Sequence, residues 1–153
     1  MPFIFFMMIQ KTILPIELLF IEDAGYHLLV KAKVNGKAAT LLIDTGASKT
    51  VFDKGRILRF TDEKNFRQLE KLSTGLGTSR METQSAILKK FQLGKLSLSL
   101  FETIVIDLSH VNLTYAKLDL PAIDGVLGSD LMVKYHALID YRKKELKLQW
   151  KKQ

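Results

Sequence analysis

Three aspartates in this sequence each follow a run of aliphatic residues, and carboxylates in such positions are candidates for acid–base chemistry. They close the segments 41–44, 103–107 and 137–140. Only Asp44 continues as Thr45-Gly46. A carboxylate after a buried strand is stabilised when the following backbone turns and offers N–H groups, and glycine permits such a tight turn. We therefore take Asp44 as the candidate catalytic acid and interpret Asp107 and Asp140 as ordinary strand ends.

Other chemistries fail on the spacing of their residues. Residues 46–50, Gly-Ala-Ser-Lys-Thr, match neither a nucleophile elbow nor a phosphate loop, and residues 75–80 end in Arg where a dinucleotide fingerprint requires Gly. The histidines at 27, 110 and 136 are scattered, and cysteine is absent. A zinc site, a thiolate nucleophile and a disulfide are therefore not expected, and we predict no metal or organic cofactor.

The elements that position Asp44 are predicted to be β-strands. Short runs of β-branched and aliphatic residues alternate with turn residues, which is typical of an all-β barrel or sandwich. A strand is expected over 13–20. Residues 26–34 and 37–43 flank Asn35-Gly36, a dipeptide that favours a type I′ hairpin turn. This hairpin would deliver the chain directly to Asp44.

The second half of the chain follows the same pattern. We expect strands over 81–93, 96–100 and 103–107, and a closing hairpin formed by 137–141 and 145–150. Ser129 is expected to cap a short helix over 129–135. Residues 110–121 receive no assignment. The sequence thus predicts a mostly β domain with one or two short helices.

With these motifs in place, the sequence resembles the retropepsin-like aspartic peptidases. Their pattern is two aliphatic residues followed by Asp-Thr-Gly-Ala near the start, and two hydrophobic residues followed by Gly near the end. Residues 42–47 match the first element and Val126-Leu127-Gly128 match the second. The resemblance spans about 13–148 and implies a closed β-barrel-like acid-protease fold.

The resemblance also implies roles for individual residues. Asp44 would be the catalytic carboxylate, Thr45 would join the two catalytic loops of a dimer, and Gly46 would contact substrate through its backbone. Ala47 and Ser48 would line the substrate site. Gly75, Leu76 and Gly77 match, more loosely, the tip of a flap hairpin that covers the substrate. Residues 126–128 would support the Asp44 loop from beneath.

This chemistry requires two carboxyl groups. Two acids a hydrogen bond apart cannot both ionise, so they share one proton: one accepts a proton from water while the other donates to the peptide carbonyl. The sequence has one Asp-Thr-Gly, so the second carboxylate must come from Asp44 of another copy related by a two-fold axis. We therefore expect a homodimer formed through the Asp44 loops and acting on a peptide or protein substrate.

Composition limits the location and the partners of the chain. Its 153 residues suit one globular domain, which we expect over 13–153, preceded by an apolar N-terminal extension over 1–12. That extension is too short to span a bilayer, so no stable membrane span is expected. The absence of cysteine fits a cytoplasmic location, with secreted or periplasmic locations left open.

Two alternatives to the endopeptidase come from other functional classes. One is a catalytically inactive module of the same fold that dimerises or binds peptides. The other is a nucleic-acid-associated protein, because the formal charge of +7 is concentrated near the C-terminus. The interleaved aromatic residues of a single-strand binder do not occur in that basic segment, so we interpret it as a solvated face and expect no nucleic acid.

Overall fold

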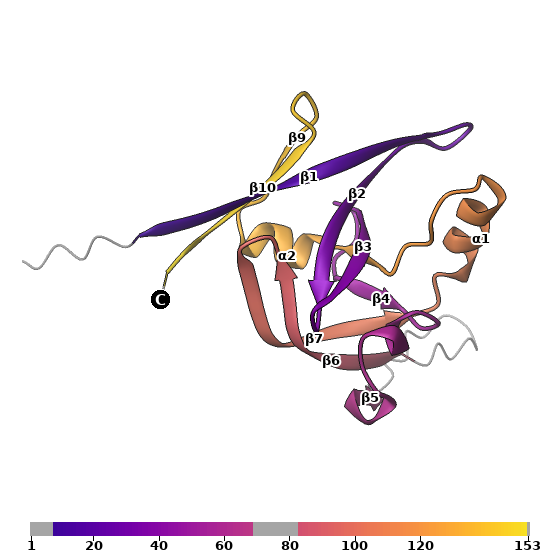
Figure 1. Ribbon diagram of the computed structural model, residues 1–153, viewed down its shortest axis with the longest axis horizontal. Helices are drawn as coiled ribbons and strands as arrows, with labels where there is room; N and C mark the ends of the chain where they lie inside the picture. Colours follow the sequence, from indigo (N-terminus) through magenta and orange to yellow (C-terminus); the bar gives the residue numbers. More distant parts are fainter. Residues whose placement is uncertain (1–7, 69–82, 153) are drawn as a thin grey trace, which may run out of the picture.

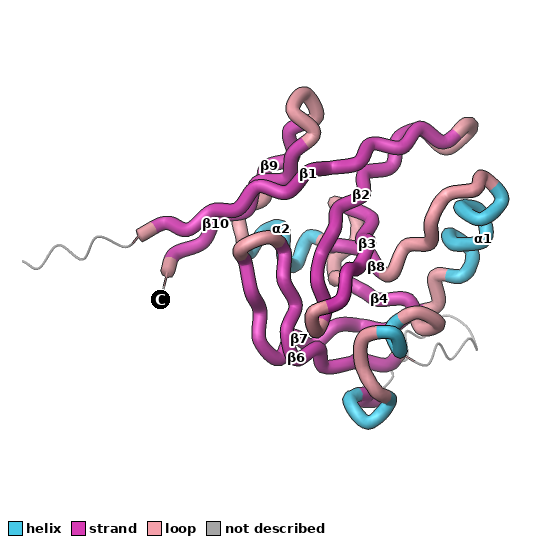
Figure 2. The backbone as a smooth tube through the Cα atoms, in the orientation of Figure 1, coloured by secondary structure: helices cyan, strands magenta, loops and turns pink. Residues whose placement is uncertain are grey.

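The structure is a computed structural model that describes residues 8–68 and 83–152 of the chain (Figure 1). The strands in chain order are β1 (Ile9–Ile21), β2 (Gly25–Val34), β3 (Lys37–Ile43), β4 (Val51–Asp53), β5 (Phe66–Gln68), β6 (Gln84–Leu93), β7 (Leu96–Ile106), β8 (Gly125–Leu127), β9 (Leu138–Asp140) and β10 (Glu145–Lys151). The helical elements are the 3-10 turns η1 (Ile57–Arg59) and η2 (Glu63–Asn65) and the α-helices α1 (Ser109–Lys117) and α2 (Ser129–Lys134). Figure 2 shows how strands dominate, which confirms the predicted class.

Six of the strands close into a barrel. They are hydrogen-bonded in the order β6-β7-β4-β8-β3-β2, and β2 pairs with β6 to complete the ring. The β3–β8 and β4–β7 pairs are parallel, whereas the other four are antiparallel. The barrel is filled by fully buried apolar side chains, including Val34, Leu41, Phe52, Phe91 and Leu127. The expected closed β-barrel is therefore confirmed.

The β2–β3 hairpin has the predicted turn. Asn35 and Gly36 have φ angles of 49° and 83°, the left-handed values that both central residues of a type I′ turn require. The Asn35 side chain accepts a hydrogen bond from the Lys90 N–H at 3.0 Å, which ties the turn to β6. Leu29 pairs with Leu42 at the other end of the hairpin, so β3 delivers the chain to Asp44 as expected.

An outer sheet of β1, β10 and β9 extends from the barrel (Figure 1). The strand β1 pairs with β10 over 9–15 and with β2 over 16–21. The strand β10 pairs in turn with β9, which confirms the predicted closing hairpin. The expected domain boundary between residues 12 and 13 falls inside β1 and stays a prediction. Within residues 8–68 and 83–152, the helices are too short or too polar to cross a membrane.

Three details differ from the expectations. The predicted strands 96–100 and 103–107 form one continuous strand, β7, in which Leu100 takes a left-handed φ of 52°. Part of the unassigned segment forms α1, because Tyr115 is buried against the β1–β2 hairpin. The prediction of Ser129 as a helix cap is wrong. Gly128 occupies the cap position, and Ser129 is the first residue of the helix. The Ser129 N–H donates to the Ala47 carbonyl.

Candidate active site

The loop that carries Asp44 crosses over the end of another strand. The strand β8 lies between β3 and β4, parallel to the first and antiparallel to the second. The chain leaves β3 at Ile43 and returns as β4 at Val51, so residues 44–50 must pass over the C-terminal end of β8. The predicted residues Asp44, Thr45, Gly46, Ala47 and Ser48 therefore occupy one loop supported from beneath.

Asp44 is fixed at its backbone and accessible at its side chain. Its N–H donates to the carbonyl of Leu127 at 3.0 Å, which extends the β3–β8 pairing by one residue. One carboxylate oxygen, Oδ1, accepts the N–H of Gly46 at 2.9 Å. Asp44, Thr45 and Gly46 are all exposed. The loop thus presents a carboxylate whose position is set by two backbone hydrogen bonds and which can still reach water or a ligand.

Gly128 and Ser129 attach the loop to the following helix. The Ser129 N–H donates to the Ala47 carbonyl at 2.7 Å, and the Ala47 N–H donates to the Asp44 carbonyl at 3.2 Å. A Cβ atom placed on Gly128 would lie 2.6 Å from the carbonyl oxygen of Lys49. Glycine is required here because the backbone of the loop occupies the space that any side chain would need.

Thr50 and Asp130 support the site, and sequence reasoning missed both. Thr50 is 1% exposed, and its hydroxyl donates to Asp130 Oδ1 at 2.8 Å while accepting the Gly128 N–H at 3.1 Å. Its carbonyl accepts the hydroxyl of Thr103 at 3.1 Å. In the sequence, the only signals for these two residues were a hydroxyl at the end of the loop and an acid in the first turn of the predicted helix. Each is common in proteins, and only the fold brings them together.

Local geometry does not distinguish Asp44 from Asp107. Asp107 Oδ1 accepts the N–H of Ser109 at 2.8 Å, the same bond to the residue two positions on that Asp44 makes. Hydrogen bonds from the Ser109 side chain and backbone hold the pKa of Asp107 below its ordinary value. Asp140 likewise accepts the Lys143 N–H at 2.9 Å. What separates Asp44 is the support of its loop by β8 and α2.

Thr45 borders an open, mainly apolar hollow of about 510 Å³. We call it the Thr45 hollow; it is lined by Thr45, Ser129, Met132, Val133, His136, Ala137, Leu138 and Ile139. No carboxyl group belongs to this lining, and within the part of the chain that the structure describes Asp44 makes no hydrogen bond to a second acid. Among the described residues, Asp44 is thus not hydrogen-bonded to a second carboxyl group.

The remaining predicted site residues divide into two groups. Ser48 is exposed, and Ala47 is partly buried against the apolar cluster that includes Leu29, Tyr115 and Val126. Gly75, Leu76 and Gly77 lie outside the described residues. The described structure therefore brings together the five residues 44–48 with the supporting segment 126–128.

Comparisons with known proteins agree with this geometry. Residues 30–131, more than half of the chain, match the family model described as aspartyl protease. Among solved structures, the chain is similar to a retropepsin-like aspartic protease from Rickettsia conorii, with 18% identity, a TM-score of 0.58 and 96% coverage of both chains. It has a weaker similarity to the retroviral protease-like domain of Ddi1 from Leishmania major, with 17% identity, a TM-score of 0.48, and coverage of 80% of this chain and 87% of that one. A comparison of the chain with curated proteins found no match.

Proposed function

This chain belongs to the aspartyl protease family and has a retropepsin-like fold, and from that premise we propose that it is a homodimeric endopeptidase that uses two copies of Asp44. The observation that carries the proposal is the exposed Asp44 carboxylate, held by the Gly46 N–H on a loop packed over β8. Such a loop holds the Asp44 carboxylate in a fixed position relative to β8 and leaves its second oxygen available to a water molecule or a substrate.

The proposed reaction adds water to a peptide bond. One Asp44 carboxylate accepts a proton from a water molecule as the water oxygen bonds to the carbonyl carbon, and the protonated Asp44 of the partner subunit donates its proton to the carbonyl oxygen. The first Asp44 then donates the proton it gained to the peptide nitrogen, the partner's Asp44 takes a proton back from a hydroxyl of the tetrahedral intermediate, and the C–N bond breaks to give a carboxylic acid and an amine. Each carboxyl thereby ends the cycle in its starting protonation state, so the reaction as proposed needs no metal or organic cofactor.

Other residues of the loop would position this chemistry. Thr45 is exposed beside Asp44 and can reach a second copy of the loop across the two-fold axis. Gly46, Ala47 and Ser48 would bind the substrate backbone, and Gly75, Leu76 and Gly77 would cover it.

The test compares Asp44→Asn with Asp107→Asn. Both aspartates follow a strand and accept an N–H from two residues on, so the two substitutions disturb the backbone similarly. Cleavage of a diverse peptide library between pH 3 and 7 should be lost in Asp44→Asn and retained in Asp107→Asn, with sedimentation showing a dimer in both. A wild-type dimer that cleaves no peptide would instead support the catalytically inactive module.

A further inference from the structure

A second hollow, with a volume of about 750 Å³, opens where the ends of β1 and β10 meet the start of β7 and the end of α2. We call it the Trp150 pocket; its lining includes Leu96, Leu98, Lys134, Tyr135, Trp150 and Lys151. Its volume falls in the range of about 300–1,000 Å³ that small-molecule sites occupy. Asp44 is not part of this lining, and the reaction proposed above assigns no role to these residues.

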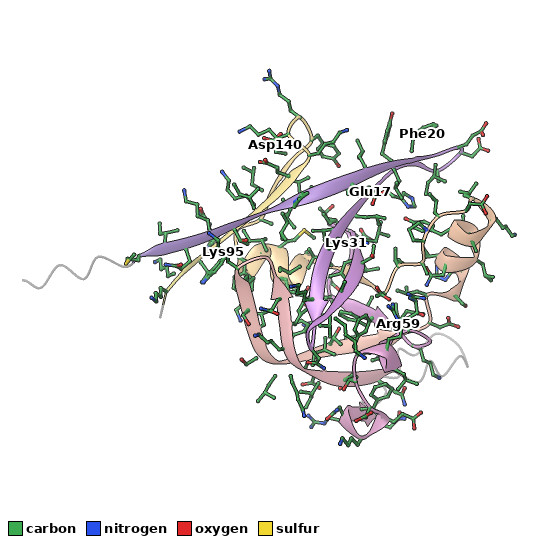
Figure 3. All side chains as sticks on the ribbon, viewed as in Figure 1. Glu17, Phe20, Lys31, Arg59, Lys95 and Asp140 are labelled. Atoms are coloured by element: carbon green, nitrogen blue, oxygen red, sulfur yellow. The ribbon has the colours of Figure 1, made fainter. Side chains whose placement is uncertain are left out.

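Hydrogen bonds of the main chain hold the elements around the pocket together. The Gln149 N–H of β10 donates to the Tyr135 carbonyl at the end of α2 at 2.8 Å. The N–H of Lys95, in the turn between β6 and β7, donates to the hydroxyl of Thr12 in β1 at 3.0 Å. Figure 1 shows the ends of β1 and β10 extending past this turn, and Figure 3 places Lys95 beside them. The pocket is therefore part of the folded chain and needs no ligand to form it.

The base of the pocket is apolar and aromatic. Leu96 and Tyr135 are 3% and 8% exposed, and Leu98 and Trp150 are partly buried. The rings of Tyr135 and Trp150 pack edge to face, with their centroids 6.4 Å apart. Ile9 of β1 adds a side chain that is 58% exposed. A lining of this kind favours an apolar group in the ligand, because binding removes apolar surface from water.

The permanently charged side chains of the pocket are lysines. Lys134, Lys151 and Lys152 are exposed, and the described residues that line the pocket include no Asp or Glu. None of the three lysines forms an ion pair within residues 8–68 and 83–152. The Lys134 Nζ lies 5.6 Å from the centroid of the Tyr135 ring, which places a positive charge next to the apolar base. The pocket therefore favours an anionic group beside an apolar one.

From this combination of charge and apolar surface we propose that the Trp150 pocket binds an anionic amphiphile, a small molecule with a carboxylate head and a hydrocarbon body. The hydrocarbon packs on Leu96, Leu98 and Trp150, and the carboxylate accepts hydrogen bonds from the ammonium groups of Lys134 and Lys151. A small polar anion would leave the apolar base in water, and an uncharged hydrocarbon would leave the lysines without a partner. The inference goes beyond the proposed peptidase activity and does not depend on it.

The fluorescence of Trp150 tests the proposal, because the chain has a single tryptophan. The probe is sodium decanoate, kept below the concentration at which it forms micelles. Decanol supplies the same hydrocarbon without the charge, and acetate supplies the carboxylate without the hydrocarbon. We expect a saturable change with decanoate, one decanoate per chain by equilibrium dialysis, and a Kd about tenfold or more below that of decanol or acetate. Equal affinities for decanoate and decanol, or no saturable binding, would overturn the proposal.

Two matched pairs of variants locate the binding. Lys134→Gln removes a charge from the pocket, whereas Lys33→Gln removes one from an exposed lysine of β2. Ile9→Ser removes an apolar side chain from the pocket, whereas Leu113→Ser removes a similarly exposed one from α1. The Kd for decanoate should rise by about threefold or more in the two pocket variants and stay unchanged in the two controls. The same Kd in all four variants would show that decanoate binds elsewhere.

Other occupants of the pocket give different results. If residues 1–7 of the same chain fill it, decanoate binds only when two of their side chains are replaced, in the full-length double variant Phe5→Ser/Phe6→Ser. If a second copy of the chain fills it, Trp150 fluorescence changes with protein concentration and does not respond to decanoate. Either result would overturn the proposal.

The pocket and the peptidase can fail separately. Asp44→Asn should bind decanoate with the Kd of the wild type, because Asp44 does not line the pocket. A chain that binds decanoate in this way but cleaves no peptide supports the pocket and refutes the peptidase. A chain that cleaves peptides but does not bind decanoate refutes the pocket alone.

Discussion

Thr50 donates its hydroxyl hydrogen to Asp130 over 2.8 Å, joining the end of the Asp44 loop to the first turn of α2. The same hydroxyl oxygen accepts the N–H of Gly128, the residue that touches the loop from beneath. One buried side chain thereby joins the Asp44 loop both to Gly128 and to the first turn of α2. We expect the position of Asp44 to depend on this connection, although neither Thr50 nor Asp130 forms a hydrogen bond with Asp44 in the described structure.

Replacing Thr50 by Val should weaken both stability and catalysis. The change leaves the Gly128 N–H and one Asp130 oxygen without a partner, and a lost buried hydrogen bond of this kind costs about 1–3 kcal/mol. Urea denaturation measures the stability, and kcat at a fixed dimer fraction measures the catalytic effect. Thr114→Val, at an exposed threonine of α1, serves as the control and should change neither. A wild-type kcat in Thr50→Val would show that the connection does not position the acid.

Replacing Gly128 by Ala should disrupt the loop more than the fold. The new methyl group would lie 2.6 Å from the Lys49 carbonyl oxygen and 2.9 Å from the Ala47 oxygen, so the loop backbone must move. Overpacking of this kind costs about 1–3 kcal/mol. We expect a folded dimer with a reduced melting temperature and a large loss of kcat. Gly55→Ala is the control, because its methyl group would meet only a side-chain oxygen of Asp53, at 3.3 Å.

Replacing Tyr115 by Phe should alter stability in a pH-dependent manner. Tyr115 is 1% exposed and its hydroxyl lies 2.7 Å from His27 Nδ1. Burial raises the pKa of Tyr115 above its ordinary value of 10.0. The native state therefore retains the phenol proton at a pH where the unfolded chain releases it, and stability present below pH 10.0 is lost as the pH rises toward the raised value.

The Tyr115→Phe variant should lose about 1 kcal/mol near neutral pH, where the hydrogen bond is lost, and its stability should fall less steeply above pH 10.0. Urea denaturation as a function of pH measures both effects. Tyr141→Phe, at a 62% exposed tyrosine, is the control. If the free energy of unfolding falls equally steeply above pH 10.0 in the wild type and in Tyr115→Phe, the raised pKa of Tyr115 is contradicted.

Replacing Asp124 by Asn should destabilise the barrel. Asp124 is 3% exposed; its Oδ1 accepts hydrogen bonds from Arg56 Nε and Arg59 Nη1, each at 2.8 Å, and its Oδ2 accepts the Thr40 N–H. In the variant, an NH2 group replaces one of the two carboxylate oxygens, so it faces either the two arginines or the Thr40 N–H and cannot accept their hydrogen bonds. Because both arginines are partly exposed and can bind water, we expect a loss of about 2 kcal/mol in the free energy of unfolding. Asp62→Asn, in an exposed pair with Lys64, should cost no more than about 0.5 kcal/mol.

Elements whose structure depends on neighbouring residues were predicted well. The Asn35-Gly36 turn fixes the register of the β2–β3 hairpin because few residue pairs adopt two successive left-handed conformations. That register in turn places Asp44 at the end of β3. The closing hairpin was found in the same way, from two apolar runs around a basic turn.

Elements that depend on distant residues were not predicted. The helix α1 forms where Tyr115 can be buried against the β1–β2 hairpin, and the sequence around it has no clear periodicity. Ser129 does not cap α2 because Gly128 holds the cap position, and the Ser129 N–H donates to the Ala47 carbonyl, far away in the sequence. Thr50 and Asp130 were missed for the same reason.

The sequence by itself determined the mostly β class, the hairpin that leads to Asp44, and the Asp-Thr-Gly segment that distinguishes this aspartate from Asp107 and Asp140. The tertiary structure alone decided that β8 would pass beneath the loop and that Gly128, Thr50 and Asp130 would hold it. It also decided that the ends of β1, α2 and β10 and the start of β7 would meet around Trp150. Turn conformations and strand periodicity are set by residues close together in the chain, whereas closing the barrel brings together segments about 80 residues apart, and no local preference encodes that contact.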